Sequence, residues 1–396
     1  MTGGRRRWVI LAVGTMSQAA TCSFLYGVPM LVPALRADEH LSLFGASLIV
    51  SAPMVGLLLT LIAWGAAADR HGERVVIVSG VRSAAGLLVL AALLPGTPAL
   101  AALLALAGAA GASVSAASGR VVMGWFPVRE RGLAMGTRQT AQPLGVAAAA
   151  LALPSLARSF GVHAALLFPA ALCALAALAV LVLVSDPPRA ARGADAPAVV
   201  SPYRGSWHLG RVHIASALLV VPQFAMATFT LVYLVGQRHW DPAVAGRMIF
   251  GFQVAGAAGR VVSGVWSDRV RSRLVPMRQL AVASTGLMIV LSLGAWLDAW
   301  WIVVGFALSA VVTVADNGLA YTSVAELAGT DWSGRALGVQ NTLQNLAGVA
   351  TAPALAAIIG ESRYALGFVV VAIFPLLAVP VTPVRAERFR SVITTN

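Results

Sequence analysis

Two ionisable residues, Arg260 and Asp316, lie inside long apolar runs of this 396-residue chain. A charge buried in lipid costs several kcal/mol, so each needs a reason. The planar fork of Arg260 can bind both oxygens of a carboxylate at once, and a lone acid such as Asp316 can take up a proton. Arg260 could instead form an internal ion pair or extend toward the membrane surface. Asp316 could be held by Arg260 in a salt bridge, or it could contact the solute directly.

Amide side chains accompany these two charges. Gln253, Gly256 and Arg260 follow helical spacing and share a face, and Asn317 adjoins Asp316 on a small, polar stretch. Amides can donate and accept hydrogen bonds, which suits a polar solute, although they could equally join helices to one another. The predicted substrate-binding residues are Arg260, Gln253, Asn317, Gln18, Gln223, Gln142, Gln344 and Asn345, with Tyr26 either as an aromatic lid or as an interface residue.

The composition excludes a water-soluble fold. Hydrophobic residues make up 59% of the chain and charged residues only 11%, so lipid must be the solvent. The net charge is +13 and every basic residue is Arg, but these arginines stand in short loops between apolar runs. That placement is typical of membrane topology and argues against a nucleic-acid partner.

Apolar runs of about 20 residues predict membrane-spanning helices. There are twelve, and the first follows Arg5–Arg7 as an uncleaved helix. A Pro-, Gly- and charge-rich stretch predicts a cytoplasmic linker over 185–210, which separates an N-terminal six-helix bundle (1–184) from a C-terminal one (211–396). The predicted spans are 8–35, 43–68, 75–94, 99–123, 133–157, 164–184, 212–236, 243–267, 277–297, 300–324, 336–359 and 364–383.

Arginine placement predicts the orientation, because positive residues accumulate on the cytoplasmic side. With the N-terminus inside, most arginines fall in inside segments. Only four fall in outside loops, namely Arg36, Arg158, Arg238 and Arg363. We therefore expect both termini to be cytoplasmic and the chain to lie in the cytoplasmic membrane.

The two halves resemble each other in sequence. The stretch 65–74 matches 264–273, with Asp69 and Asp268 in step, and the stretch 132–145 matches 334–347, with Gln142 and Gln344 in step. Two matches at nearly the same offset indicate a duplicated six-helix unit.

The loop Gly65-x-x-x-Asp69-Arg70-x-Gly72-x-Arg74 resembles the signature between helices 2 and 3 of the major facilitator superfamily, and 264–273 resembles its second copy. The resemblance implies an all-α membrane protein with 12 transmembrane helices in two pseudo-symmetric six-helix bundles. It also implies a solute site between the bundles and alternating access. The run Gly259 to Asp268 resembles helix 8 of monocarboxylate and oxalate carriers, where the arginine contacts the carboxylate. Gly256 departs from that pattern, because those carriers often have an acid there.

The loop motif can act as a latch on the cytoplasmic side. Asp69 can accept hydrogen bonds from free amides at a helix N-terminus, and arginines can bind nearby carboxylates and helix ends. Arg120 could join this latch or contact substrate, and Arg138 could be a gate. The predicted gating and latch residues are Gly65, Asp69, Arg70, Gly72, Arg74, Arg120, Arg138, Asp268 and Arg269.

These observations predict a secondary active transporter for a small organic anion, coupled to protons or to another ion, with Asp316 as the proton-coupling residue. In-span arginines outnumber the in-span acid, which favours an anion. A proton-coupled drug or metabolite exporter is the alternative, but helices 1 and 4 lack the acid it would need. No catalytic cluster, phosphate loop or metal-ligand spacing occurs, so we expect no enzyme activity, no cofactor and no metal. The expected partners are the solute, the ion and the bilayer, and the chain is expected to be a monomer.

Overall fold

A computed structural model of the chain describes residues 3–186, 201–204, 206–360, 362–385 and 387. Within these residues every regular element is a helix and none is a strand, which confirms the predicted all-α fold. Eleven helical segments of this part are long and apolar enough to cross a membrane. The twelfth, α8 (Leu167–Leu183), is apolar and has 17 residues, which is near the lower limit of about 17 for a spanning helix.

The chain divides into two compact units, which are described separately. Unit 1 comprises 1–126, 140–199 and 329–341, and unit 2 comprises 127–139, 200–328 and 342–396. Each unit therefore contains a short segment from the other half of the sequence. Of the predicted linker over 185–210, residues 187–200 and 205 lie outside the described residues.

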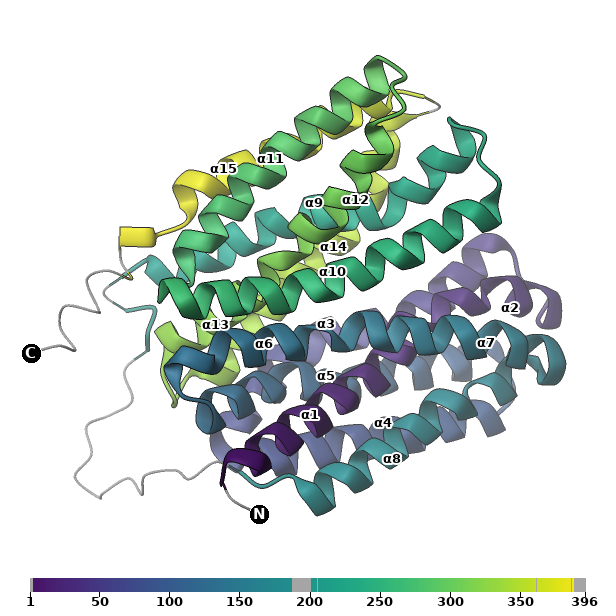
Figure 1. Cartoon of the computed structure of the whole chain (residues 1–396). Coiled ribbons are helices and arrows are strands. Elements are labelled where there is room, and N and C mark those ends of the chain that lie inside the picture. The colour runs from purple at the N-terminus through teal and green to yellow at the C-terminus, as the bar shows by residue number, and fades with distance from the viewer. Residues whose placement is uncertain (1–2, 187–200, 205, 361, 386, 388–396) are drawn as a thin grey trace, which may run out of the picture. The chain divides into compact units, whose positions relative to one another are not determined.

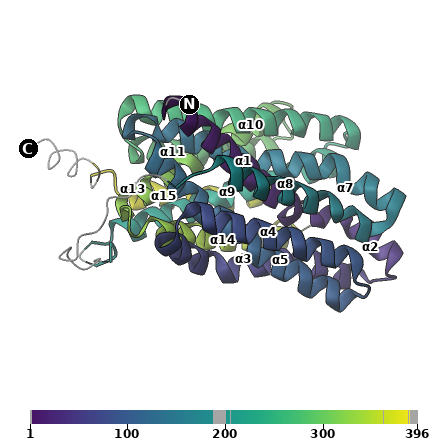
Figure 2. The same cartoon turned by 90° about the horizontal axis from the view of Figure 1, so that it is seen from below.

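Unit 1 is a bundle in which α3 lies along α5, while α4 lies between α5 and α8 (Figures 1 and 2). Helices α3 and α5 approach closely through small residues, because a Cβ at Gly108 would lie 1.9 Å from the Pro53 carbonyl oxygen. The elements are α1 (Gly3–Leu25), η1 (Val28–Leu31), α2 (Val32–Asp38), α3 (Leu43–His71), α4 (Glu73–Leu93), α5 (Thr97–Trp125), α7 (Ala141–Ala165), α8 and the start of α14 (Ser333–Ile359).

Unit 2 is built in a similar way: α15 packs against α9 and α11, while α10 packs against α6 and α12. Aromatic side chains fill one end of it, where the rings of Tyr233, Phe306 and Phe368 pack together. Its elements are η2 (Val128–Glu130), α6 (Arg131–Gln139), α9 (His208–Gly236), α10 (Pro242–Val270), α11 (Leu274–Trp296), α12 (Ile302–Ala315), α13 (Asn317–Ala328), α15 (Tyr364–Val381) and the rest of α14.

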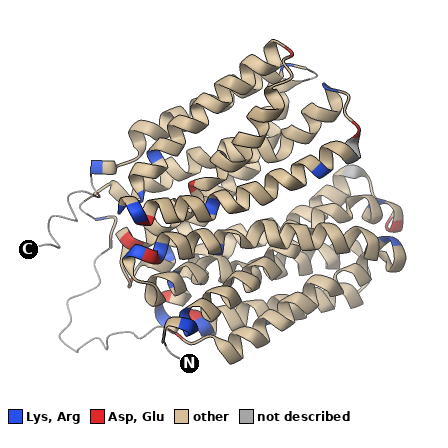
Figure 3. Ribbon diagram, in the orientation of Figure 1, with Lys and Arg blue, Asp and Glu red and all other residues tan. Residues whose placement is uncertain are grey.

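The surface of the spans is apolar. Leu59 is 79% exposed, Leu151 81% and Phe250 63%, although each is a large hydrophobic residue. Charged residues lie mostly near the ends of the helices (Figure 3). Such a surface is stable only against lipid, so the chain is a multi-pass membrane protein.

Besides the span predicted over 8–35, which consists of α1, η1 and α2, two predicted spans are each broken at one residue. The span predicted over 133–157 consists of α6 and α7, which meet at Thr140, and the span predicted over 300–324 consists of α12 and α13, which meet at Asp316. Pro143 accounts for the first break, because its ring clashes with the carbonyl four residues earlier, that of Gln139, and it has no N–H to donate to it. The second break contains no proline.

Candidate functional site

Arg260 lies on helix α10 of unit 2 and is only 5% exposed. Close packing buries this stretch of α10, since a Cβ at Gly256 would lie 2.6 Å from the Ala310 carbonyl oxygen of α12. This explains the departure from the carboxylate-carrier pattern: the close approach of α12 leaves no room for an acid at position 256.

The guanidinium of Arg260 meets the first helix break. Its Nη1 donates to the carbonyl oxygen of Gln139, the last residue of α6. Pro143 deprives that oxygen of its usual helical donor, so Arg260 supplies a replacement. One turn along α10, the Ser263 hydroxyl donates to the Ala315 carbonyl oxygen at 2.6 Å, just before the second break. Helix α10 therefore stabilises both breaks.

Asp316 is the residue at the second break, between α12 and α13, and it is 2% exposed. Its Oδ2 is buried and has no hydrogen-bond partner among the described residues. The positive charge of Arg260 interacts electrostatically with this carboxyl group. The structure therefore brings together the two in-span charges that the sequence analysis selected.

Arg138 is a second buried arginine of unit 2. It is 1% exposed, its Nη1 donates to the Gln139 side-chain oxygen at 2.8 Å, and its guanidinium carbon lies 5.5 Å from the centre of the Tyr321 ring. The charges of Arg138 and Arg260 both act on the Tyr321 hydroxyl. Tyr321 is not among the residues predicted from the sequence, although it is the only aromatic residue of α13.

Three predicted substrate residues form a chain of amide hydrogen bonds in unit 2. The Asn317 amide nitrogen donates to the Gln223 side-chain oxygen at 2.8 Å, and the Gln344 amide nitrogen approaches the Asn317 oxygen at 3.3 Å. Gln344 also donates to the Ser216 hydroxyl at 2.6 Å. Helices α9, α13 and α14 thus contribute one amide each to a buried polar strip beside Asp316.

The remaining predicted substrate residues are more scattered. In unit 1, Gln18 is 9% exposed and accepts a 3.3 Å hydrogen bond from the Ser118 hydroxyl. Tyr26 packs against the apolar core of that unit, and Gln142 is half-buried. In unit 2, Asn345 is half-buried and Gln253 is exposed, although Gln253 shares a helix face with the buried Arg260.

Asp69 forms a cluster at the end of α3 in unit 1. Its carboxylate accepts hydrogen bonds from the backbone N–H groups of Gly334 and Arg335, at 2.9 and 3.1 Å, and pairs with the Arg120 guanidinium. Arg120 also pairs with Glu73 at 2.7 Å. Gly65 permits the contact, because a Cβ there would lie 2.3 Å from the Gly334 carbonyl oxygen.

Asp268 forms the equivalent cluster in unit 2. It accepts hydrogen bonds from the backbone N–H groups of Gly132 and Leu133, at 3.0 and 2.8 Å, and pairs with Arg273 at 2.5 Å. Arg273 also approaches Glu326 at 3.4 Å. Burial lowers the pKa of Arg273, but the charges of Glu326 and Asp268 raise it more, so its pKa lies above the ordinary value.

Of the other predicted latch residues, some take part in the structure at the end of α3 and some are exposed. Gly72 joins α3 to α4 with φ of 93°, a conformation that favours glycine. The Arg74 guanidinium donates to the Leu181 carbonyl oxygen, and the Arg74 backbone N–H donates to the Asp186 carboxylate. Arg70 and Arg269 are exposed. Glu73 and Glu326 are not among the predicted latch residues, although Glu73 lies within the loop motif over 65–74.

Comparisons with known proteins agree with this architecture. Residues 11–352 match the family described as Major Facilitator Superfamily. The Uncharacterized MFS-type transporter Rv2994 of Mycobacterium tuberculosis is 42% identical over 385 residues, which are 97% of this chain and 86% of that one. The Probable nitrate/nitrite transporter NarK2 of the same species is 27% identical over 251 residues, 62% of each chain.

A solved structure shares the fold. The human organic anion transporter MFSD10 (TETRAN) matches with a TM-score of 0.74 at 18% identity, over 96% of this chain and 100% of that one. The helical architecture, the family match and the relative at 42% identity agree with one another. The chain belongs to the major facilitator superfamily, whose members are membrane transporters.

Proposed function

We propose that this transporter carries a small organic anion, of the carboxylate class, by proton-coupled alternating access. The observation that carries the proposal is the pair of buried arginines in unit 2, Arg138 and Arg260, whose charges both act on the Tyr321 hydroxyl. The buried carboxyl group of Asp316 accompanies them, and the charge of Arg260 acts on it.

Charge balance favours an anion at this site. Two ionised guanidinium groups and one carboxylate leave one positive charge in a region of low dielectric constant. A carboxylate about 4 Å from a guanidinium would gain about 4 kcal/mol at an effective dielectric constant of about 20. Arginine adds geometric selectivity, because its fork matches the two oxygens of a carboxylate.

The relative named as a probable nitrate/nitrite transporter supports this class of solute, since both of those substrates are small anions with delocalised charge. Carboxylates share that charge distribution. The chain of amides formed by Gln223, Asn317 and Gln344 would then bind the polar remainder of the solute. Gln18, Gln142, Asn345, Gln253 and Tyr26 stay proposed substrate residues on the sequence argument alone.

Proton coupling is proposed for Asp316. A buried carboxylate oxygen without a donor is expensive to keep charged, and a bound proton removes that cost. With Asp316 protonated, the site would hold two positive charges and bind the anion more strongly. Proton and anion would then move together, which is the logic of a symporter.

Asp69 and Asp268 would act as latches in this cycle. Each carboxylate occupies two backbone N–H groups near the start of a helix, and each is paired with an arginine, Arg120 or Arg273. We propose that the six-helix halves over 1–184 and 211–396 move in the cytoplasmic membrane, with both termini inside, as these contacts break and re-form.

Uptake into proteoliposomes tests the proposal. Purified protein is reconstituted, an inward proton gradient is imposed, and a panel of radiolabelled mono- and dicarboxylates is offered beside sugars and cationic drugs. We expect gradient-dependent uptake of a carboxylate. Uptake or expulsion of cationic drugs, with no movement of any carboxylate, would overturn the proposal in favour of an exporter.

A further inference from the structure

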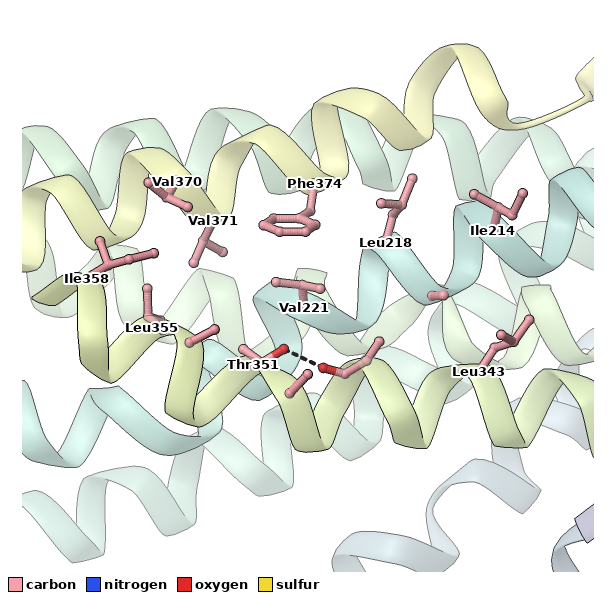
Figure 4. A pocket seen from close by; sticks show the side chains of 14 residues that line it. Ile214, Leu218, Val221, Leu343, Thr351, Leu355, Ile358, Val370, Val371 and Phe374 are labelled. Atoms are coloured by element: carbon pink, nitrogen blue, oxygen red, sulfur yellow. Dashed lines mark hydrogen bonds between the residues drawn. The ribbon is translucent and has the colours of Figure 1, made fainter. Parts of the chain in front are cut away.

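Unit 2 contains an apolar cavity bounded by α9, α14 and α15 (Figure 4). Its volume is about 340 Å³. Thr351 is the only lining residue with a polar side chain, and its hydroxyl donates to the Ala347 carbonyl oxygen at 2.7 Å, the bond drawn in Figure 4. The wall therefore offers nothing to an anion, and the cavity is separate from the site proposed above.

The cavity opens on the surface of the spans. Ile214 is 40% exposed and Leu343 36%, and Ala350 and Ala354 of α14 are exposed as well. These residues belong to helices that are long and apolar enough to cross a membrane. An opening that faces lipid would meet hydrocarbon chains that match its wall.

The matching position in the first half of the sequence is closely packed. Gly145 of α7 corresponds to Ala347 of α14 in the internal repeat. A Cβ at Gly145 would lie 2.3 Å from the Ala19 carbonyl oxygen, so α7 lies directly against α1. In unit 2, Ala347 lines the cavity, and the Phe224 ring of α9 lies against the next residue, Gly348.

A cationic group lies at one end of the cavity. Ile214 marks that end, beside Leu343 and near the start of α9 (Figure 4). One turn earlier on α9, Arg211 donates to the carbonyl oxygens of Val381 and Pro380 at the end of α15, at 2.9 and 2.8 Å. Trp207 precedes it and is 66% exposed, which is typical of a residue at the level of lipid headgroups.

We infer that this cavity holds one acyl chain of an anionic membrane phospholipid, whose phosphate group lies at the start of α9 beside Arg211. The apolar wall, the opening among exposed aliphatic residues and the arginine at one end each match one part of such a lipid. A bound chain would fill the gap between α14 and its two neighbours and stabilise unit 2.

Lipid retention tests the acyl-chain site. The full chain is purified in mild detergent with phosphatidylglycerol, and bound lipid is counted by native mass spectrometry. We expect the wild type to retain one phospholipid, and Ala354→Phe, which fills the cavity, to reduce retention several-fold. Ala356→Phe is the matched control, because Ala356 is exposed on the same helix but does not line the cavity. Ala350→Leu is a milder filling variant if Ala354→Phe does not fold.

Two results would overturn the inference. The first is equal retention by the wild type and by a folded filling variant. The second is a filling variant that retains as much lipid as the wild type but no longer transports an apolar compound that the wild type carries. That result would assign the cavity to a solute. For the headgroup, Arg211→Gln should abolish a preference for phosphatidylglycerol over phosphatidylcholine. A wild type that retains both lipids equally would refute the role of Arg211.

Discussion

The Arg260 guanidinium donates a hydrogen bond to the carbonyl oxygen of Gln139, at the residue where α6 ends. Pro143 leaves that oxygen without its helical donor, and the Arg260 guanidinium replaces it. The same guanidinium can bind an anion. An incoming carboxylate would compete with the Gln139 carbonyl for the same fork. Solute binding would then act directly on the junction between α6 and α7.

Replacing Arg260 should weaken anion binding. Truncating one partner of a buried charge pair costs about 2–5 kcal/mol, so we expect the apparent KM for the carboxylate to rise by more than about tenfold in Arg260→Gln. Arg260→Lys keeps the charge but loses the fork, and it should recover only part of the affinity. Initial uptake rates in proteoliposomes measure both.

Two controls separate binding from support of the helix. Arg82→Gln removes an exposed arginine from α4 and should leave uptake unchanged. Pro143→Ala restores an N–H donor to the Gln139 carbonyl, so a purely structural role of Arg260 would make Arg260→Gln harmless in that background. Full activity of the double variant would contradict the anion-binding role.

Asp316→Asn should uncouple transport from the proton gradient. The amide is nearly isosteric with the carboxyl but cannot exchange a proton at physiological pH. We expect accumulation driven by a pH gradient to be lost, while exchange of internal for external solute continues. Both are measured with the same labelled carboxylate, and accumulation that still followed the gradient in this variant would refute the coupling role.

The latch carboxylates should contribute to stability. Hydrogen bonds to charged groups are worth about 1.5–3 kcal/mol, so Asp69→Asn and Asp268→Asn should each lower the midpoint of thermal unfolding in detergent and slow transport. Asp241→Asn is the control, because Asp241 accepts a hydrogen bond from Val244 N–H at the start of α10, and asparagine can accept it equally well. Latch variants as stable and as active as this control would remove the proposed role.

Close packing at Gly256 should make it intolerant of even one methyl group. Gly256→Ala forces a Cβ to 2.6 Å from the Ala310 carbonyl oxygen, and overpacking of this kind costs about 1–3 kcal/mol. Gly286→Ala gains the same helix propensity but meets nothing within 4 Å, so it should be neutral or stabilising. Thermal unfolding of the two variants side by side measures the difference, and equal midpoints would contradict the packing argument.

Tyr203 should make the protein sensitive to strong alkali. Burial raises its pKa from 10.0 to about 12, and its hydroxyl lies 3.0 Å from the His213 ring nitrogen. The unfolded chain therefore loses this proton at a lower pH than the folded one, and stability falls as pH rises from about 10 to about 12. Thermal unfolding across that range should decline less steeply in Tyr203→Phe, and parallel declines in the two proteins would refute this assignment.

Most of the fold follows from the sequence, because apolar length alone defines a membrane span. Each of the twelve predicted spans corresponds to one helix or to consecutive helical segments. Pro143 signals the break at Thr140 in the local sequence. The break at Asp316 has no such signal, because the hydrogen bond that stabilises it comes from Ser263 on another helix. Local sequence does not encode contacts of that kind.

The candidate site was only partly predictable for the same reason. The cost of burying a charge in lipid identified Arg260 and Asp316 individually, and the correspondence between the two halves identified the amides of Gln223 and Gln344. The approach of Arg138 to Tyr321 depends on tertiary packing between segments that lie far apart in the sequence. Arg138 was consequently assigned to a gate, and Tyr321 was not considered.

The composition of the two units also bears on how the protein is made. Unit 1 includes residues 329–341, and the partners of Asp69 at Gly334 and Arg335 belong to that segment. During synthesis, the first six helices enter the membrane long before the ribosome reaches those residues. Asp69 can therefore pair with Arg120 as soon as the first half is made, but its backbone partners become available only after most of the chain has been translated.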